Sequence, residues 1–461
     1  MAIGFGRPDP IPSNTGLFVG TAPQAADPGG NLCQNEGSDR SYASFVTEIP
    51  PTGLRHDSYA ALRVPAFRRY FLGNSILILG WQMQKVAVGW EVYELTDSAL
   101  HLGYVGLVQF VPLVALAILA GHVTDTYNRK HVLMVALGLN ALADAGLAWN
   151  SVSSESVYAT YSFLLLTGVA RSFQNPSRAA LLPGIVPRHV FPNAVTWNSS
   201  GFELSTMAGP ALGGFLIWYF ESPALVYGLN GVAALVFMAL VSGIPYAHKA
   251  QEKARVTLTS LLAGFRYIRN NQAVMGAITL DMFGVLLGGA TALMPIFARD
   301  ILEVGSMGLG WLMAAPAIGA FSMAMFQAHR PPIGRAGRTL LLAVAGFGTV
   351  TILFGLSENF LLSMLMLYLL GACDNISVVI RSTLVQLLTP DEMRGRVSAI
   401  NYLFIGTSNE LGGFESGLVA GLFGPVVSVV SGGIGTLLVV ASVAWHMPGL
   451  RRFGPLVEKE S

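Results

Sequence analysis

The sequence predicts an all-α membrane protein whose twelve transmembrane helices form two parallel six-helix bundles. Of its 461 residues, 52% are hydrophobic and only 11% are charged, whereas about a quarter of a soluble domain is charged. Apolar stretches long enough to cross ~30 Å of hydrocarbon recur from Arg69 almost to the C-terminus. The longest internal polar segment, between Ala247 and Ala273, divides these stretches into six and six.

The apolar stretches are too long for membrane strands, which need only ~10 residues of alternating hydrophobicity. Helices satisfy all their backbone hydrogen bonds internally, as the membrane core requires. The predicted spans are 70–94, 100–122, 131–150, 157–177, 194–219, 224–246, 274–298, 308–328, 339–356, 359–385, 397–421 and 426–446.

The polar segments predict five parts. Residues 1–60 are rich in Pro, Gly and Ser and have no apolar run that fits a signal peptide, so we expect a disordered cytoplasmic tail. The two bundles cover 61–247 and 274–447, and 448–461 form a second cytoplasmic tail. In the linker, 248–273, apolar residues at helical spacing predict an amphipathic helix over Leu258–Arg269.

The charges of the loops predict the orientation. If the N-terminus is cytoplasmic, the cytoplasmic loops collect most of the Lys and Arg residues, and Arg299 is the one cation in the opposite loops. Those opposite loops carry acids, among them Asp97, Glu155 and Glu303. This asymmetry follows the positive-inside rule, so we expect a multi-pass protein with both termini cytoplasmic.

Composition and motifs exclude several functions. The net charge of +1 provides no basic field for nucleic acid. The chain lacks a Gly-x-x-x-x-Gly-Lys-Ser/Thr run, so we expect no ATP-hydrolysing site. Two cysteines and scattered histidines form no metal-binding pattern, and no catalytic triad is recognisable. We therefore expect neither an enzyme nor a cofactor or metal.

The two halves are related by a weak internal repeat. A shift of 203 residues places Arg178 on Arg381, Gly209 on Gly412 and Gly214 on Gly417. Two parallel repeats with a binding site between them near the membrane midplane are typical of one large class of secondary transporter.

Two short motifs carry a family resemblance. The segment from Gly121 through Asp125 to Arg129 and Lys130 resembles the loop motif of the major facilitator superfamily, although Thr126 and Asn128 depart from it. The run Gly209-Pro210-Ala-Leu-Gly213-Gly214 resembles the glycine-proline motif of its antiporters. The resemblance implies gating or conformational roles for Gly121, Asp125, Arg129, Gly209, Pro210, Gly213 and Gly214.

Two longer blocks, 170–183 and 390–413, resemble the branch that contains the enterobactin exporter and related bacterial efflux proteins. The resemblance to the superfamily covers about residues 65–450. It implies alternating-access transport in a bacterial plasma (inner) membrane, and a siderophore or a drug-like compound as cargo.

Charged residues inside the spans are costly, so each needs a reason to be there. We count six acids and two bases: Asp144, Glu203, Asp281, Asp374, Glu410, Glu415, Lys85 and Arg171. At least four acids lack a basic partner, and a buried unpaired carboxylate takes up a proton. We expect proton coupling at Asp374, Glu410, Asp281 and Glu203, with static helix-packing contacts as the alternative.

A second set of polar residues is expected to bind substrate. Lys85 lies at the centre of the first span near Gln82 and Trp81, and the resemblance places this span at the central cavity. We expect contacts to a small solute from Lys85, Gln82, Trp81, Arg171 and Asn401, with aromatic stacking on Trp81. In the alternative interpretation, Lys85 pairs with Asp144 or Asp281.

The sequence thus predicts a monomeric, proton-coupled exporter whose partners are a small-molecule substrate, protons and the lipid bilayer. An uptake symporter or a facilitator of the same fold is the first alternative. A membrane receptor or scaffold that does not transport is the more remote one.

Overall fold

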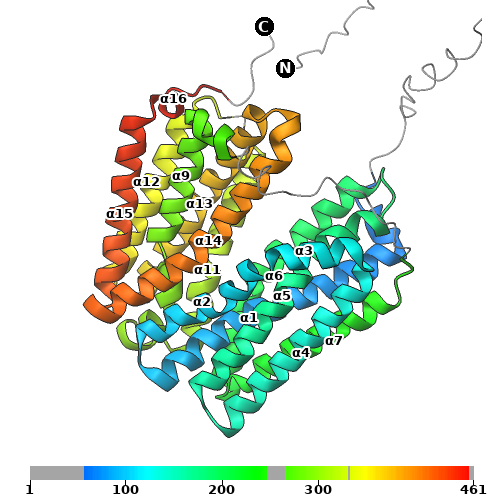
Figure 1. Cartoon of the computed structure of the whole chain (residues 1–461). Helices are drawn as coiled ribbons and strands as arrows, with labels where there is room; N and C mark the ends of the chain where they lie inside the picture. The colour runs from blue at the N-terminus through cyan, green and yellow to red at the C-terminus, as the bar shows by residue number, and fades with distance from the viewer. Residues whose placement is uncertain (1–56, 247–264, 331–332, 456–461) are drawn as a thin grey trace, which may run out of the picture. The chain divides into compact units, whose positions relative to one another are not determined.

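The computed structural model describes residues 57–246, 265–330 and 333–455, and within them it shows an all-helical membrane protein (Figure 1). The fold class predicted from the sequence is confirmed. All the helices belong to one unit, Ser58–Ser461. The N-terminal half contains η1 (Ala61–Arg63), α1 (Pro65–Thr96), α2 (Ala99–Ala115), α3 (Ala117–Thr126), α4 (Arg129–Ser153), α5 (Val157–Ile185), α6 (Phe191–Phe220) and α7 (Ala224–Ser242).

The C-terminal half repeats this plan. Its elements are α9 (Gln272–Leu287), η2 (Ala290–Leu293), α10 (Met294–Ile296), the π-helical η3 (Phe297–Ile301), α11 (Gly305–Ala328), α12 (Ala336–Gly355), α13 (Phe360–Leu388), α14 (Asp391–Phe423), α15 (Pro425–His446) and α16 (Pro448–Arg451).

Hydropathy differs among the long helices for a structural reason. Among the described residues, seven segments are long and apolar enough to cross a membrane, and the pair α2 and α3 would make an eighth. The remaining long helices, α1, α5, α6 and α14, have 29–33 residues and are less apolar. These four carry many of the polar side chains that line the interior, as described below.

The spans predicted over 100–122 and 274–298 each contain an interruption of the helix, although Gln272–Ile301 still forms one segment long and apolar enough to cross a membrane. The axes of α2 and α3 differ by 51°, just beyond Pro112, which cannot donate a helical hydrogen bond. In the second case α9 ends before Gly288 and Gly289. A Cβ on Gly289 would lie 2.5 Å from the Gly412 carbonyl oxygen, so the break lets this segment lie directly against α14.

The predicted second tail, 448–461, begins with packed structure. Leu450 in α16 is fully buried, and its side chain lies against Gly276 of α9. At the other end of the chain, the Ser58 carbonyl accepts hydrogen bonds from Asn193 and Trp197. Of the predicted interfacial helix Leu258–Arg269, residues 265–269 lie within the described part of the chain and are helical, and the rest lies outside it, as does most of the predicted tail 1–60.

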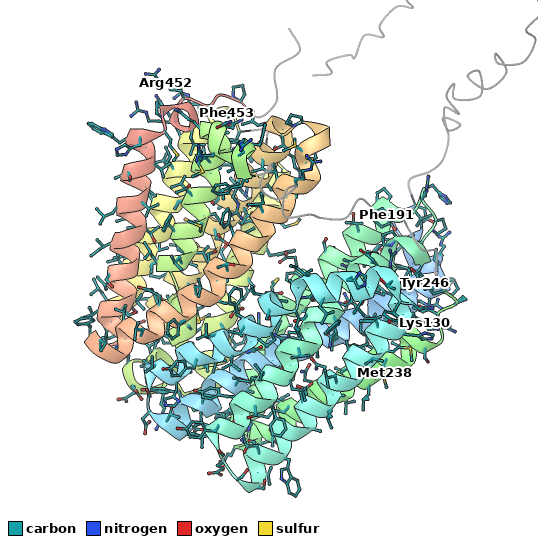
Figure 2. All side chains as sticks on the ribbon, in the orientation of Figure 1. Lys130, Phe191, Met238, Tyr246, Arg452 and Phe453 are labelled. Carbon is teal, nitrogen blue, oxygen red and sulfur yellow. The ribbon has the colours of Figure 1, made fainter. Side chains whose placement is uncertain are left out.

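We call the membrane face on which residues 246 and 265 lie the linker face, and the opposite one the distal face. Figure 2 shows Lys130, Phe191 and Tyr246 together at the linker face of the N-terminal half. Lys130 Nζ donates to the carbonyl oxygens of Ser242 and Ile244 at 2.7 and 2.8 Å. This cation therefore caps the C-terminal end of α7, where helix carbonyls lack partners.

Two glycine pairs join the halves. Helix α6 packs on α11, and α2 packs on α14. A Cβ on Gly214 would lie 2.8 Å from the Cα of Gly310, and a Cβ on Gly417 would lie 2.8 Å from the Cα of Gly103. Only residues without side chains permit such close helix crossings. Gly214 and Gly417 are equivalent in the internal repeat, so the same kind of glycine contact joins the halves at two places.

Polar contacts join the halves at the distal face. The Tyr93 hydroxyl of α1 donates to Asp300 of η3. Arg299 donates to Asp97 Oδ1 at 2.7 Å, and its guanidinium lies 5.4 Å from the centre of the Tyr93 ring. Together with the glycine pairs, these contacts close the distal face.

Gly214→Val should destabilise this closed state, because its side chain would overlap the backbone of α11. We expect a loss of about 1–3 kcal/mol, as for overpacking elsewhere, measured by thermal unfolding of the purified protein. Gly228→Val on α7 is the matched control, because nothing lies within 4 Å of a Cβ at that position. Equal effects of both variants would contradict a tight α6–α11 contact.

Candidate functional site

A chamber of about 380 Å³ lies between the halves, and a second one of about 230 Å³ adjoins it. The N-terminal half contributes residues from α1, α2, α5 and α6, and the C-terminal half contributes residues from η2, α10, α11 and α14. Both chambers share Gln82, Lys85, Gln109, Arg171 and Glu410. The shared residues make one continuous polar site, which we call the central chamber.

The charges in the central chamber come from opposite halves. Lys85 and Arg171 belong to the N-terminal half, and they line both parts of the chamber together with Glu410 of the C-terminal half. Lys85 projects into the chamber and is exposed there. Glu410 lies against α2, where a Cβ on Gly106 would be 2.9 Å from its carboxylate. One acid therefore faces two cations across the interface between the halves.

An aromatic ring holds Arg171 in place. The guanidinium groups of Arg171 and Arg178 lie 4.7 and 4.8 Å from the centre of the Trp81 ring. Arg171 also donates to Gln109 Oε1 at 3.0 Å, and Arg178 donates to Asn74 Oδ1 at 2.8 Å. Cation–π contacts of this kind strengthen away from water. Trp81 also lines the smaller part of the central chamber, so the stacking of a solute on its ring stays a prediction.

The C-terminal half holds a separate charged cluster. Asp281 of α9 forms a buried ion pair with Arg381 of α13. Asp374 and Ser377 lie beside it around a pocket of only about 10 Å³, which has room for a single water molecule. Asp281 and Asp374 were predicted to couple protons, and the structure places them together but outside the central chamber.

Two other predicted site residues lie elsewhere. Glu203 lines a separate groove of about 680 Å³ between α6 and α11, with Met207 and Phe321 among its neighbours. Asn401 lines neither part of the central chamber. Gln82 does line it, and its amide donates to the Thr206 hydroxyl at 2.8 Å.

The residues of the glycine-proline motif lie at two interfaces. Gly209 and Gly213 pack on α1, where Gly213 would bring a Cβ within 2.9 Å of Met83. Gly214 contacts α11 in the other half, and Pro210 lines the central chamber. This segment of α6 therefore touches the chamber wall and the interface between halves at once.

The predicted loop motif is partly helical. Gly121 and Asp125 lie within α3, and Asp125 is exposed. Arg129 donates to the carbonyl oxygen of Ala180 in α5 at 3.1 Å, and it is 8% exposed. The basic residues of this motif, Arg129 and Lys130, thus donate hydrogen bonds to backbone carbonyl groups of α5 and α7 at the linker face.

Sequence analysis missed Gln109 and Thr206 as chamber residues, although each is a polar residue in a largely apolar span. The alternative that Lys85 pairs with Asp144 or Asp281 is wrong, because Asp144 accepts hydrogen bonds from three amide side chains and Asp281 pairs with Arg381, whereas Lys85 lines the central chamber together with Glu410. An opposite charge cannot be assigned to a partner helix from the sequence of either helix alone.

Two parallel six-helix halves around a polar chamber define a transporter of the major facilitator superfamily. Within it, the chain belongs to the family described as transmembrane secretion effector, whose model matches residues 56–454. The family is one of transporters, so the protein is not an enzyme.

Curated relatives and solved structures agree with this assignment. The chain is 27% identical over 394 residues to the enterobactin exporter EntS of Shigella boydii serotype 18, covering 84% of this chain and 93% of the relative. EntS of Escherichia coli O81 (strain ED1a) matches equally.

Among solved structures, a peptide transporter POT superposes with a TM-score of 0.68 at 10% identity, over 85% of this chain and 95% of the other. The nucleoside transporter NupG superposes with 0.64 at 14% identity, over 84% and 99%. These likenesses establish the shared fold.

Asp281→Asn should leave Arg381 buried without its counter-charge. Removing one partner of a buried pair costs about 3–5 kcal/mol, so thermal unfolding should show a large loss of stability. The double variant Asp281→Asn/Arg381→Gln should recover most of that loss. A single variant as stable as the wild type would mean that the pair contributes nothing to the fold.

Proposed function

We propose that this protein is a proton-driven exporter of a small organic solute, with the two halves rocking about the central chamber. The observation that carries the proposal is Glu410 of one half facing Lys85 and Arg171 of the other. Movement of the halves against each other changes the spacing of these charges. The charge state of the chamber is thereby tied to its conformation.

Competition between a proton and the solute for the Glu410 carboxylate couples the flow of protons to the flow of solute. An ionised carboxylate accepts hydrogen bonds, so it binds hydroxyl or amide donors of a solute. A proton on Glu410 removes part of this acceptor capacity and the attraction to Lys85 and Arg171. For a solute held mainly through its hydroxyl or amide donors, proton entry therefore favours release, as antiport requires.

Orientation and cargo follow from the charges of the faces and from the relatives. The linker face carries Lys130 and Arg129, whereas four acids with positive φ, Asp97, Glu155, Glu221 and Glu303, end helical segments at the distal face. We propose that the linker face and both termini are cytoplasmic, in a bacterial plasma membrane. The name of the EntS relatives supports a siderophore or a similar drug-like solute as cargo, moved by a monomer.

Reconstituted vesicles with an imposed pH gradient test the proposal. With enterobactin and ethidium as probes, the gradient should accelerate solute movement against the direction of proton flow. Glu410→Gln should lower this acceleration at least tenfold, which corresponds to about 1.4 kcal/mol of coupling, because the amide cannot exchange a proton.

Glu415→Gln is the matched control, since Glu415 lies on the same helix but lines neither part of the central chamber. It should keep the wild-type response. Solute movement that ignores the gradient would refute the antiport proposal. Movement in the same direction as the protons would establish an uptake symporter, the alternative for this fold.

A further inference from the structure

Another charged site lies inside the N-terminal half. Asp144 of α4 is fully buried, and so are Asn140 and Asn230. Its Oδ1 accepts a hydrogen bond from Gln84 at 2.8 Å, and its Oδ2 accepts from Asn140 at 2.7 Å and from Asn230 at 2.8 Å. Asn230 also donates to Gln84 Oε1 at 3.0 Å. Three helices, α1, α4 and α7, thus present amides to one carboxylate.

The amides can serve either charge state of the carboxyl group. As the structure stands, all three donate, which suits an ionised carboxylate. The Oδ1 atoms of Asn140 and Asn230 are buried and have no hydrogen-bond partner among the described residues. An amide offers a donor and an acceptor on the same rotatable group. If either amide rotates, its oxygen can accept the O–H of a protonated Asp144, so the carboxyl group has hydrogen-bond partners in both charge states.

The site communicates with the central chamber through two residues. Gln84, which bonds Asp144, also lines the chamber. Arg171, which lines the chamber too, is attracted by Asp144 in its own half and by Glu410 in the other. A proton on Asp144 therefore removes one attraction on the Arg171 guanidinium, which then interacts more strongly with Glu410 or with a bound solute.

Few other charged or titratable groups act on Asp144. The Arg171 guanidinium of α5 and the Tyr227 phenol of α7 lie near enough to act on it electrostatically, although in the part of the chain that the structure describes neither forms a hydrogen bond or an ion pair with it. Helix α1 and the preceding turn of α4 present the neutral amides of Gln84 and Asn140. No ion pair to Asp144 is found among the described residues, so rotation of the amides is not opposed by a fixed cation.

We infer that Asp144 is a reversible proton-binding site, held by the amides of Gln84, Asn140 and Asn230 and linked to the central chamber by Gln84 and Arg171. The inference rests on the proposed function in taking the proton as the coupling ion. It adds a proton site in the N-terminal half to the one proposed at Glu410 in the C-terminal half.

Infrared difference spectra of the full chain in lipid nanodiscs, recorded as the pH is stepped, test this directly and need no solute. The carbonyl stretch of a protonated, buried carboxyl group should appear on acidification in the wild type. Asp144→Asn should remove one component of that band and leave the component of Glu410, whereas Asp374→Asn, at a half-buried aspartate of the other half, should keep the component that Asp144→Asn removes. A spectrum of Asp144→Asn that superimposes on the wild type overturns the inference.

A second variant covers the case in which Asp144→Asn does not fold. Asn230→Leu removes one donor from the ionised form while keeping the carboxyl group, and it should move the midpoint of the band by about one pH unit. An unchanged midpoint overturns the inference as well. Failure of the proposed function looks different: enterobactin movement then ignores the pH gradient in the wild type, while the Asp144 band is still present.

Discussion

The hydrocarbon core of the membrane offers no water, so every charged side chain within the helices must be balanced by other groups of the protein. This constraint organises the whole interior. The charged residues gather in a few clusters, and each cluster balances charge differently. The central chamber opposes one acid to two cations, α9 and α13 form a buried ion pair, and Asp144 is surrounded by amides.

These three ways of balancing a buried charge differ in whether the charged group can gain or lose a proton. A buried ion pair such as Asp281–Arg381 loses much free energy when either partner changes its charge, so it suits a fixed structural contact. Amides can turn, and therefore they tolerate a change of charge. In the central chamber the balancing groups come from different halves, as they do in the Arg299–Asp97 pair at the distal face, so the charge balance there depends on how the halves are placed.

The two halves use equivalent positions for different purposes. Arg178 and Arg381 are related by the internal repeat, yet Arg178 lies on Trp81 and bonds Asn74, whereas Arg381 pairs with Asp281. At the other equivalent pair, Arg171 faces the central chamber and Asp374 lies in its own small pocket. The repeat thus preserves the helix scaffold and the glycine contacts, while the charges have diverged. This divergence gives the central chamber cations from one side and an acid from the other.

The sequence by itself determined the helical class, the recurrence of long apolar stretches, the division into halves and the set of charged residues inside the spans. These are local properties, because span length and hydropathy depend on neighbouring residues along one helix. Only the tertiary structure decided that Lys85 and Arg171 face Glu410, that Asp281 pairs with Arg381, and that Asp144 binds amides. Asn140 lies one turn before Asp144 on the same helix, but each of the other partners is contributed by another helix far away along the chain. The choice of those partners depends on how the helices rotate and pack, which no single segment encodes.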